Sequence, residues 1–190
     1  MAPKVKVTRE EIVSAALDLV RREEALNARS LAKELNCSTQ PVFSNFASVE
    51  EVREAVLQAA YRLYLKTMRE EAAKPDLPPY KAAGMGYIRF AREEKQLFRL
   101  LFMRSRTAVQ QVREDEEELR NWAALIREKS GLSEEDAARM HLEMWACVHG
   151  IAAMLATDYQ DLDGELVSGM LTDLYQGLRK RYEEKTSWMR

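Results

Sequence analysis

The sequence predicts an all-α protein of about nine helices, with a small N-terminal head joined by one long helix to a larger C-terminal body. Three observations carry this prediction. Glycine and proline, which interrupt helices, account for only 7 and 5 of the 190 residues. Apolar residues recur at three- and four-residue spacing along nearly the whole chain, which is the period of an amphipathic helix. Capping patterns that begin helices precede several of these stretches.

The composition excludes several classes of protein. With 46% hydrophobic and 32% charged residues, the chain can bury a core, which argues against disorder. No apolar run approaches the roughly 20 residues of a membrane span and no signal segment opens the chain, so we expect a cytoplasmic protein without a membrane partner. Cys37 and Cys147 are far apart, and His141 and His149 lack a third ligand, so neither a disulfide nor a metal or other cofactor is expected.

Local signals place three short helices in the first third of the chain. Thr8 and Glu11 have the spacing of a capping box, which begins the first helix. The second helix ends near Asn36, a residue that tolerates the left-handed backbone of a tight turn. Ser38 is the predicted N-cap of the third helix. Pro41 is tolerated in its first turn, because backbone N–H groups have no intrahelical partner there.

A long fourth helix is predicted to join the head to the remainder of the chain. Ser48 and Glu51 form a second predicted capping box at its start. One apolar stripe begins at Val52 and faces the head, whereas a second stripe, which includes Tyr61, faces the other way. A helix with two apolar faces contacts two bodies, so this helix is interpreted as the joint between them.

The remainder of the chain contains five further predicted helices. They follow a proline-rich loop at 74–80. Their predicted positions are 81–94, 95–104, about 107–130, 133–158 and about 163–184. The second half of 133–158 and much of the last helix are apolar nearly all round, which predicts that these two helices build a subunit interface beside the core. We therefore divide the chain into an N-terminal domain, 5–66, and a C-terminal domain, 67–190.

A helix-turn-helix pattern occupies about residues 29–47. Its most specific residues are Arg29, Leu31, Ala32, Leu35, Ser38, Val42, Phe43 and Phe46, followed by Ser48 with acidic residues behind it. With the capped first helix and the long fourth helix, this pattern resembles the TetR family of transcriptional regulators. A second stretch, Trp145 with His149 and Gly150, resembles the tryptophan–histidine–glycine pattern of one branch of TetR-type C-terminal domains.

The resemblance implies a homodimer that binds a palindromic operator in double-stranded DNA and is released from it by a small ligand. Two residues depart from the family pattern. Phe43 stands where tyrosine is usual and Val49 where lysine is usual, and both usual residues contact phosphate. The third predicted helix carries no charge, so phosphate contacts are assigned to Lys4, Lys6 and Arg9 and to the cations of the second helix.

Three sites are predicted. The DNA-binding residues offer a cation to phosphate or a side-chain tip to base edges, with Gln40 suited to adenine: Arg29, Lys33, Ser38, Thr39, Gln40, Pro41, Phe43, Ser44 and Asn45. A pocket for a hydrophobic or aromatic ligand is predicted in the C-terminal domain, although each of its residues could instead be an ordinary core residue. These residues are Tyr87, Phe90, Phe98, Phe102, Met103, Trp122, Met140, Met144, Trp145 and His149. The dimer interface takes Met154, Leu166, Met170, Leu171, Leu174 and Gly177.

Two other classes of function stay open beside a repressor. The first is a helical homodimeric adaptor or ligand-binding protein that has lost DNA binding, which the residues Phe43 and Val49 favour. The second is a small all-helical enzyme. The sequence contains no Ser/His/Asp set or paired carboxylates of the kind that catalysis uses, so no enzymatic activity is predicted.

Overall fold

The computed structural model describes residues 7–103 and 109–188, with side-chain surroundings for all of these except 109–119 and 185–188. Every regular element in this part of the chain is an α-helix, which confirms the predicted fold class. The helices are α1 (Arg9–Arg21), α2 (Ala28–Glu34), α3 (Gln40–Asn45), α4 (Val49–Ala72), α5 (Pro79–Glu93), α6 (Lys95–Phe102), α7 (Val109–Ser130), α8 (Glu134–Ala156) and α9 (Gly164–Trp188).

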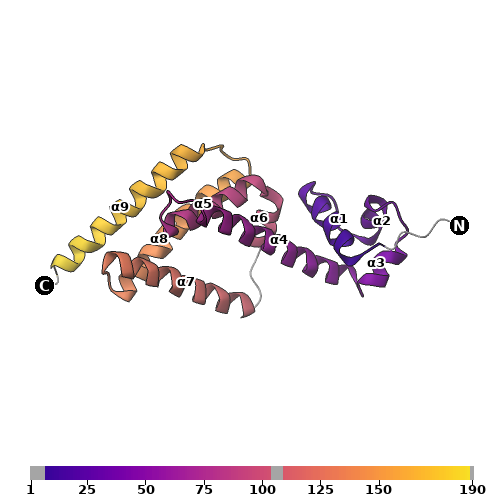
Figure 1. Cartoon of the computed structure of the whole chain (residues 1–190), viewed down its shortest axis with the longest axis horizontal. Coiled ribbons are helices and arrows are strands. Elements are labelled where there is room, and N and C mark those ends of the chain that lie inside the picture. Colours follow the sequence, from indigo (N-terminus) through magenta and orange to yellow (C-terminus); the bar gives the residue numbers. More distant parts are fainter. Residues whose placement is uncertain (1–6, 104–108, 189–190) are drawn as a thin grey trace.

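The molecule is elongated, with α1–α3 at one end and α9 at the other (Figure 1). Helix α4 runs from the α1–α3 group into the bundle formed by α5, α6, α8 and the remaining helices. We call α1–α3 with the first turns of α4 the head, and the rest the body. Helices α2 and α3 lie on the side of the head that is remote from the body, so their outer faces are open to a partner.

Capping explains where the head helices begin. Thr8 and Glu11 form the complete predicted capping box at α1. At α4 the Ser48 hydroxyl accepts from the Glu51 N–H, but the Glu51 carboxylate accepts from the Ala47 N–H, so only half of the second box forms. The predicted N-cap Ser38 is wrong. Thr39 holds that position before α3, and its side chain makes no capping hydrogen bond.

The six-residue helix α3 depends on packing, because so short a helix is marginal in water. Its Val42, together with Phe46 just beyond its end, is fully buried in a head cluster, whose members are Ile12, Ala15, Ala16, Leu19, Leu31, Val42, Phe46, Val52 and Val56. The Arg9 guanidinium lies 3.9 Å from the centre of the Phe46 ring. Asn36 has φ 48°, so the predicted left-handed turn between α2 and α3 is confirmed.

Helix α4 contacts both parts of the molecule, as its two apolar stripes predict. Val52 and Val56 are buried in the head cluster, whereas Ala60 and Tyr64 are buried in the main body cluster. Further along, α4 and α5 approach closely at Gly86. A Cβ atom at that position would lie 2.9 Å from Met68 Sδ and 3.3 Å from Glu71 Cβ, so a larger residue would require the Met68 side chain to move and would crowd α4.

A second set of contacts joins head and body through α1 and α6. Arg21 forms a two-pronged ion pair with Glu94, at 2.7 and 2.9 Å. Arg99 on α6 donates to Glu23 at 2.8 Å. Leu17 and Val20 on α1 pack against both the head cluster and the main body cluster. These contacts connect α6 directly to α1 and to the segment that follows it.

Candidate functional site

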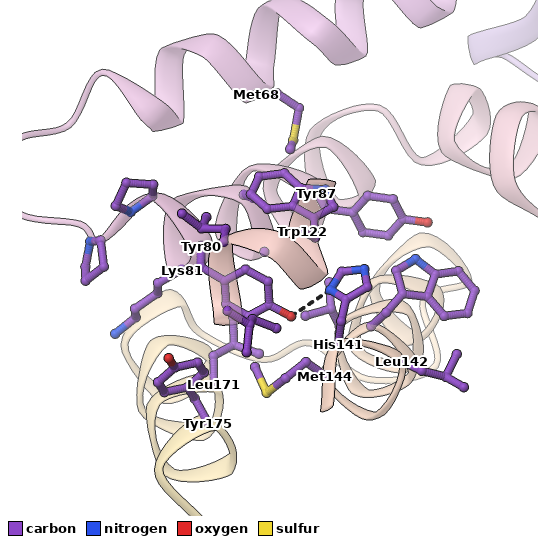
Figure 2. Close-up of a pocket in the computed structure, with 18 of the residues that line it drawn as sticks. Met68, Tyr80, Lys81, Tyr87, Trp122, His141, Leu142, Met144, Leu171 and Tyr175 are labelled. Carbon is purple, nitrogen blue, oxygen red and sulfur yellow. Dashed lines mark hydrogen bonds between the residues drawn. The ribbon is translucent and has the colours of Figure 1, made fainter. Parts of the chain in front are cut away.

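A cavity of about 1020 Å³ lies inside the body, with walls from α4, α5, α6, α7, α8 and α9. It separates two hydrophobic clusters, one built mainly on α4, α5, α6 and α8 and the other on α7, α8 and α9. Its aromatic wall residues are Tyr61, Tyr64, Tyr80, Tyr87, Phe102, Trp122, Trp145 and Tyr175. Figure 2 shows the side chains of Tyr80, Trp122, His141 and Met144 gathered around this space. A mostly apolar concave space of this size suits an organic ligand.

Half of the predicted pocket residues line this cavity: Tyr87, Phe102, Trp122, Met144 and Trp145. The other five need correction. Phe90, Phe98 and Met140 are completely buried in the core, and Met103 is 42% exposed at the end of α6. His149 lies behind the wall, where it hydrogen-bonds to Tyr87.

These corrections arise because the sequence does not show how deep in the body a side chain lies. Phe98 packs with ring centroids 5.2 Å from Tyr87 and 5.1 Å from Phe102, so it supports two wall residues from behind. Periodicity assigns such a side chain to the inward face of its helix, but it does not separate the wall of a cavity from the layer beneath it.

Several wall residues were not predicted, and Tyr80 and His141 are the most informative. The Tyr80 hydroxyl lies 2.8 Å from His141 Nδ1. The Tyr80 ring is also 5.8 Å from the Trp122 ring and 5.9 Å from the Tyr175 ring. Tyr80 ends the proline-rich segment that the sequence assigned to a loop, yet α5 already begins at Pro79. The double proline was the available signal, because proline is favoured in the first turn of a helix.

Burial fixes the protonation of this pair. It lowers the pKa of His141 to about 4 and raises the pKa of Tyr80, so both groups are neutral at pH 7. The Tyr80 hydroxyl and His141 Nδ1 thus share a hydrogen bond between two neutral groups, and the imidazole tautomer decides which of them donates. The wall therefore presents a neutral polar pair within an apolar surface.

A second Tyr–His pair lies farther along the same two helices. Tyr87 on α5 and His149 on α8 approach to 2.9 Å between the hydroxyl and Nδ1. The His149 ring stacks on Trp145 with a centroid separation of 5.0 Å and an interplanar angle of 13°. Tyr87 and Trp145 line the cavity, so His149 orients both without reaching it itself.

We expect His141→Asn to reduce the acid sensitivity of folding. The folded-state pKa of His141, about 4, lies below the unfolded value of about 6.5, so the unfolded chain binds more protons between these values. Stability is therefore lost as pH falls from about 6.5 towards 4, by about 1–2 kcal/mol between pH 7 and pH 5. Asparagine keeps an acceptor for Tyr80 and does not titrate. Urea unfolding at both pH values measures the difference, and an identical pH dependence in both proteins would contradict the assignment.

Cations on α2 form the basic part of the head. Arg29 and Lys33, one helical turn apart, are exposed and form no ion pair with any described carboxylate. The other described arginines of the head are all paired: Arg9 with Glu51, Arg21 with Asp18 and Glu94, Arg22 with Glu24 and Glu34, and Arg53 with Glu50. The Arg9 guanidinium also donates to the Asn45 carbonyl, so the predicted phosphate contact at Arg9 needs correction. Lys4 and Lys6 lie outside the described residues.

Helix α3 presents an uncharged outer face. Gln40, Ser44 and Phe43 are exposed, the last to 53%, as is Ser38 before the helix, whereas Thr39 and Pro41 are half-buried. The prediction for Asn45 needs correction. Its amide donates to the Pro41 carbonyl at 2.9 Å and to the Val7 carbonyl at 3.2 Å, so the side chain ties α3 to the N-terminal segment instead of pointing outward.

Several apolar or glycine positions on α8 and α9 are exposed, and we call them the apolar face of α8 and α9. Of the predicted interface residues, Met154, Leu166, Met170 and Gly177 are exposed and Leu174 is half-buried. A Cβ atom placed at Gly169 or Gly177 would have no heavy atom within 4 Å, so another helix can approach there. Leu171 needs correction. It is only 3% exposed and lines the cavity, so little of its surface is left for a partner.

In the described part of the chain, no helix is both long and apolar enough to cross a membrane. Within the same residues, no group of three or more His, Cys, Asp or Glu side chains is placed to hold a metal ion.

Residues 80–173 match the protein family described as "Tetracyclin repressor-like, C-terminal domain". The chain belongs to the TetR family. The matched segment begins at Tyr80 and includes most of the cavity wall. As a TetR-family protein, the chain is assigned to the DNA-binding transcriptional regulators.

The fold of this TetR-family protein is shared with a solved structure, "a TetR-like transcriptional regulator from Rhodococcus sp. RHA1". The two chains superpose with a TM-score of 0.66 at 15% sequence identity, over 88% of this chain and 92% of the other. At this identity the likeness shows the fold alone. No curated protein is significantly similar to the chain in sequence.

Proposed function

We propose that this TetR-family protein is a homodimeric repressor that binds a palindromic operator and leaves it when a largely apolar ligand occupies the cavity. In this proposal residues 5–66 read DNA, while residues 67–190 bind the ligand and dimerise. The observation that carries it is the position of α6. One face of this helix lines the cavity and the other contacts the head, so an occupied cavity acts directly on the part that would bind DNA.

Binding to DNA is supported by the placement of exposed cations on α2 and of uncharged polar side chains on α3. Arg29 and Lys33 form no ion pair with any carboxylate of the described residues and are available to phosphates, which position a protein on DNA. The exposed Gln40 follows at the start of α3, where an amide can pair bidentately with adenine. An uncharged α3 is compatible with this role, because base contacts specify the sequence while phosphate contacts supply most of the affinity.

Dimerisation is supported by the exposed apolar face of α8 and α9. Leu166 and Met170 lie one turn apart on α9 and are 49% and 38% exposed, and Met154 on α8 is 37% exposed. Exposed apolar patches of this kind mark interaction sites. A two-fold partner through this face would also present two heads, as a palindromic operator requires.

Release by a ligand is supported by consecutive residues on α6. Leu101 and Phe102 line the cavity, whereas the preceding Arg99 bonds to Glu23 and Leu100 packs against the head cluster. Helix α4 provides a second route, since it lines the cavity at Tyr61 and is buried in the head at Val56. A ligand that displaces either helix therefore changes the position of the head.

An adaptor that has lost DNA binding is the competing function. The exposed phenyl ring of Phe43 favours it, because this side chain carries no group that bonds to phosphate. Selection of bound duplexes from random DNA, followed by a gel shift with the selected palindrome and with the protein's own upstream region, separates the two functions. A regulator enriches one palindrome, whereas an adaptor enriches none.

We expect Gln40→Ala and Lys33→Ala to weaken operator binding in different ways. Loss of the Gln40 amide should cost about 1–3 kcal/mol on the operator and spare nonspecific DNA, because it removes a base contact. Loss of Lys33 should weaken binding to both operator and nonspecific DNA, because it removes a phosphate contact. It should also reduce the slope of log affinity against log salt concentration by about 1. Fluorescence anisotropy at several salt concentrations measures both. Equal losses on both DNAs for Gln40→Ala would remove it from the specificity residues.

A further inference from the structure

The charged residues among the described lining of the cavity are all basic. Among the described residues that line it, three are basic and none is acidic. The basic residues are Lys81 on α5, Lys129 on α7 and Arg179 on α9, whereas the lining residues of α4, α6 and α8 carry no formal charge at neutral pH. The positive charges of the lining thus come from α5, α7 and α9.

Lys81 differs from the other two cations. Arg179 is 2.7 Å from Glu183, and Lys129 is 3.4 Å from Glu128, so each already has a carboxylate neighbour. Half-buried Lys81 has none within ion-pair distance among the described residues. A partly buried cation without a counter-charge is unfavourable, and a bound anion would relieve that cost.

The contacts of Lys81 leave it available to a ligand. Its Nζ donates to the Thr172 hydroxyl at 2.8 Å, and that hydroxyl in turn donates to the Ser168 carbonyl at 2.9 Å. An ammonium group has three N–H donors, so two remain after Thr172 has accepted one. Thr172 thus fixes the ammonium against α9, and Figure 2 shows Lys81 on the opposite side of Tyr80 from His141.

Another part of the cavity wall accommodates an apolar body. Tyr64, Tyr87 and Phe102 pack edge to face or tilted on one another, with centroids 5.0 to 6.1 Å apart. The volume of about 1020 Å³ is at the upper end of the range for sites of drug-sized ligands. A ligand with a single polar group would therefore extend most of its length over carbon atoms.

We propose that the cavity of this protein binds an organic monocarboxylate, with the carboxylate on Lys81 and an aromatic or aliphatic body against Tyr64, Tyr87 and Phe102. This assignment rests on the proposed function, because it names the chemical class of the ligand that the cavity takes. The proposed function names a largely apolar ligand, and this assignment specifies that the ligand is an amphipathic anion. It excludes cationic compounds.

Calorimetric titration with two matched pairs of compounds tests the assignment. The pairs are dodecanoate with dodecanamide and 2-naphthaleneacetate with 2-naphthaleneacetamide, each differing only in its head group, which is an anionic carboxylate or a neutral amide. For at least one pair, the acid should bind the wild-type protein at least about tenfold more tightly than the amide, which corresponds to about 1.4 kcal/mol. In Lys81→Met the ratio should fall below about threefold through weaker binding of the acid alone, whereas Lys81→Arg should retain the preference.

The matched control is Lys180→Met, which removes a lysine next to Arg179 on α9 but outside the cavity lining. It should leave the ratio unchanged. Equal binding of acid and amide to the wild type, or a ratio that survives Lys81→Met, overturns the carboxylate assignment. If the amides bind as tightly as the acids and also release operator DNA, the proposed regulatory function is retained and only the carboxylate assignment fails. If no compound binds, both the carboxylate assignment and the proposed release by a ligand fail. Operator binding by the ligand-free protein is measured on its own and does not depend on this result.

Discussion

Leu171→Asp is expected to prevent the body from folding, whereas Met170→Asp is expected to leave a folded monomer. The two residues are neighbours on α9 with opposite environments. Leu171 is 3% exposed in the main body cluster, and Met170 is 38% exposed on the apolar face of α8 and α9. An unpaired buried carboxylate costs several kcal/mol, which is comparable to the total stability of about 5–15 kcal/mol of a typical protein. At Met170 the same carboxylate would remain hydrated in the monomer and would be buried only in the proposed dimer.

Sedimentation velocity and far-ultraviolet circular dichroism distinguish these outcomes. Met170→Asp and Leu166→Asp should sediment as monomers with wild-type helix content, and Leu171→Asp should lose helix content or aggregate. Tyr159→Asp is the control, because it replaces an apolar side chain that is 80% exposed outside the proposed interface. It should remain dimeric. A stable dimer in both Met170→Asp and Leu166→Asp would place the interface on another surface.

These neighbouring residues also illustrate how far the sequence can be interpreted. The periodicity of α9 predicts a helix with apolar residues on more than one side, and the structure has a helix over Gly164–Trp188. It does not say which side faces the chain's own core and which faces a partner, because both are apolar. Leu171 was therefore placed in the interface although it lines the cavity. Distinguishing the two required the positions of α5 and α8.

Local features were predicted better than side-chain partners. The capping box at Thr8 and the turn at Asn36 depend on residues close in sequence, and both are present. The pairing of Tyr80 with His141 joins residues 61 positions apart, so no local pattern contains it. Asn45 shows the same limit within the head. Its spacing fits an outward DNA contact, but the carbonyl of Val7, 38 residues earlier, holds its amide inside.

A compound that occupies the cavity is expected to bind about 5- to 150-fold more weakly when operator DNA is present. Coupling between two sites in proteins is commonly about 1–3 kcal/mol, and it must be reciprocal. If the ligand weakens operator binding, the operator therefore weakens ligand binding by the same factor. Trp122 and Trp145 both line the cavity, so tryptophan fluorescence follows the titration with and without DNA. Equal ligand affinities would mean that the cavity is not an inducer site.

The route of this coupling is tested by Glu94→Gln. The Arg21–Glu94 ion pair connects α1 of the head to the start of α6, and its side chains are 37% and 24% exposed. Ion pairs with this degree of exposure contribute up to about 1 kcal/mol, so removing the charge should reduce the coupling by about two- to fivefold. Ligand affinity without DNA should not change, because Glu94 is not part of the cavity wall. Glu93→Gln is the matched control, since Glu93 pairs with Arg89 within α5. If both variants keep the full coupling, the signal passes through α4 instead of through the contact between α1 and α6.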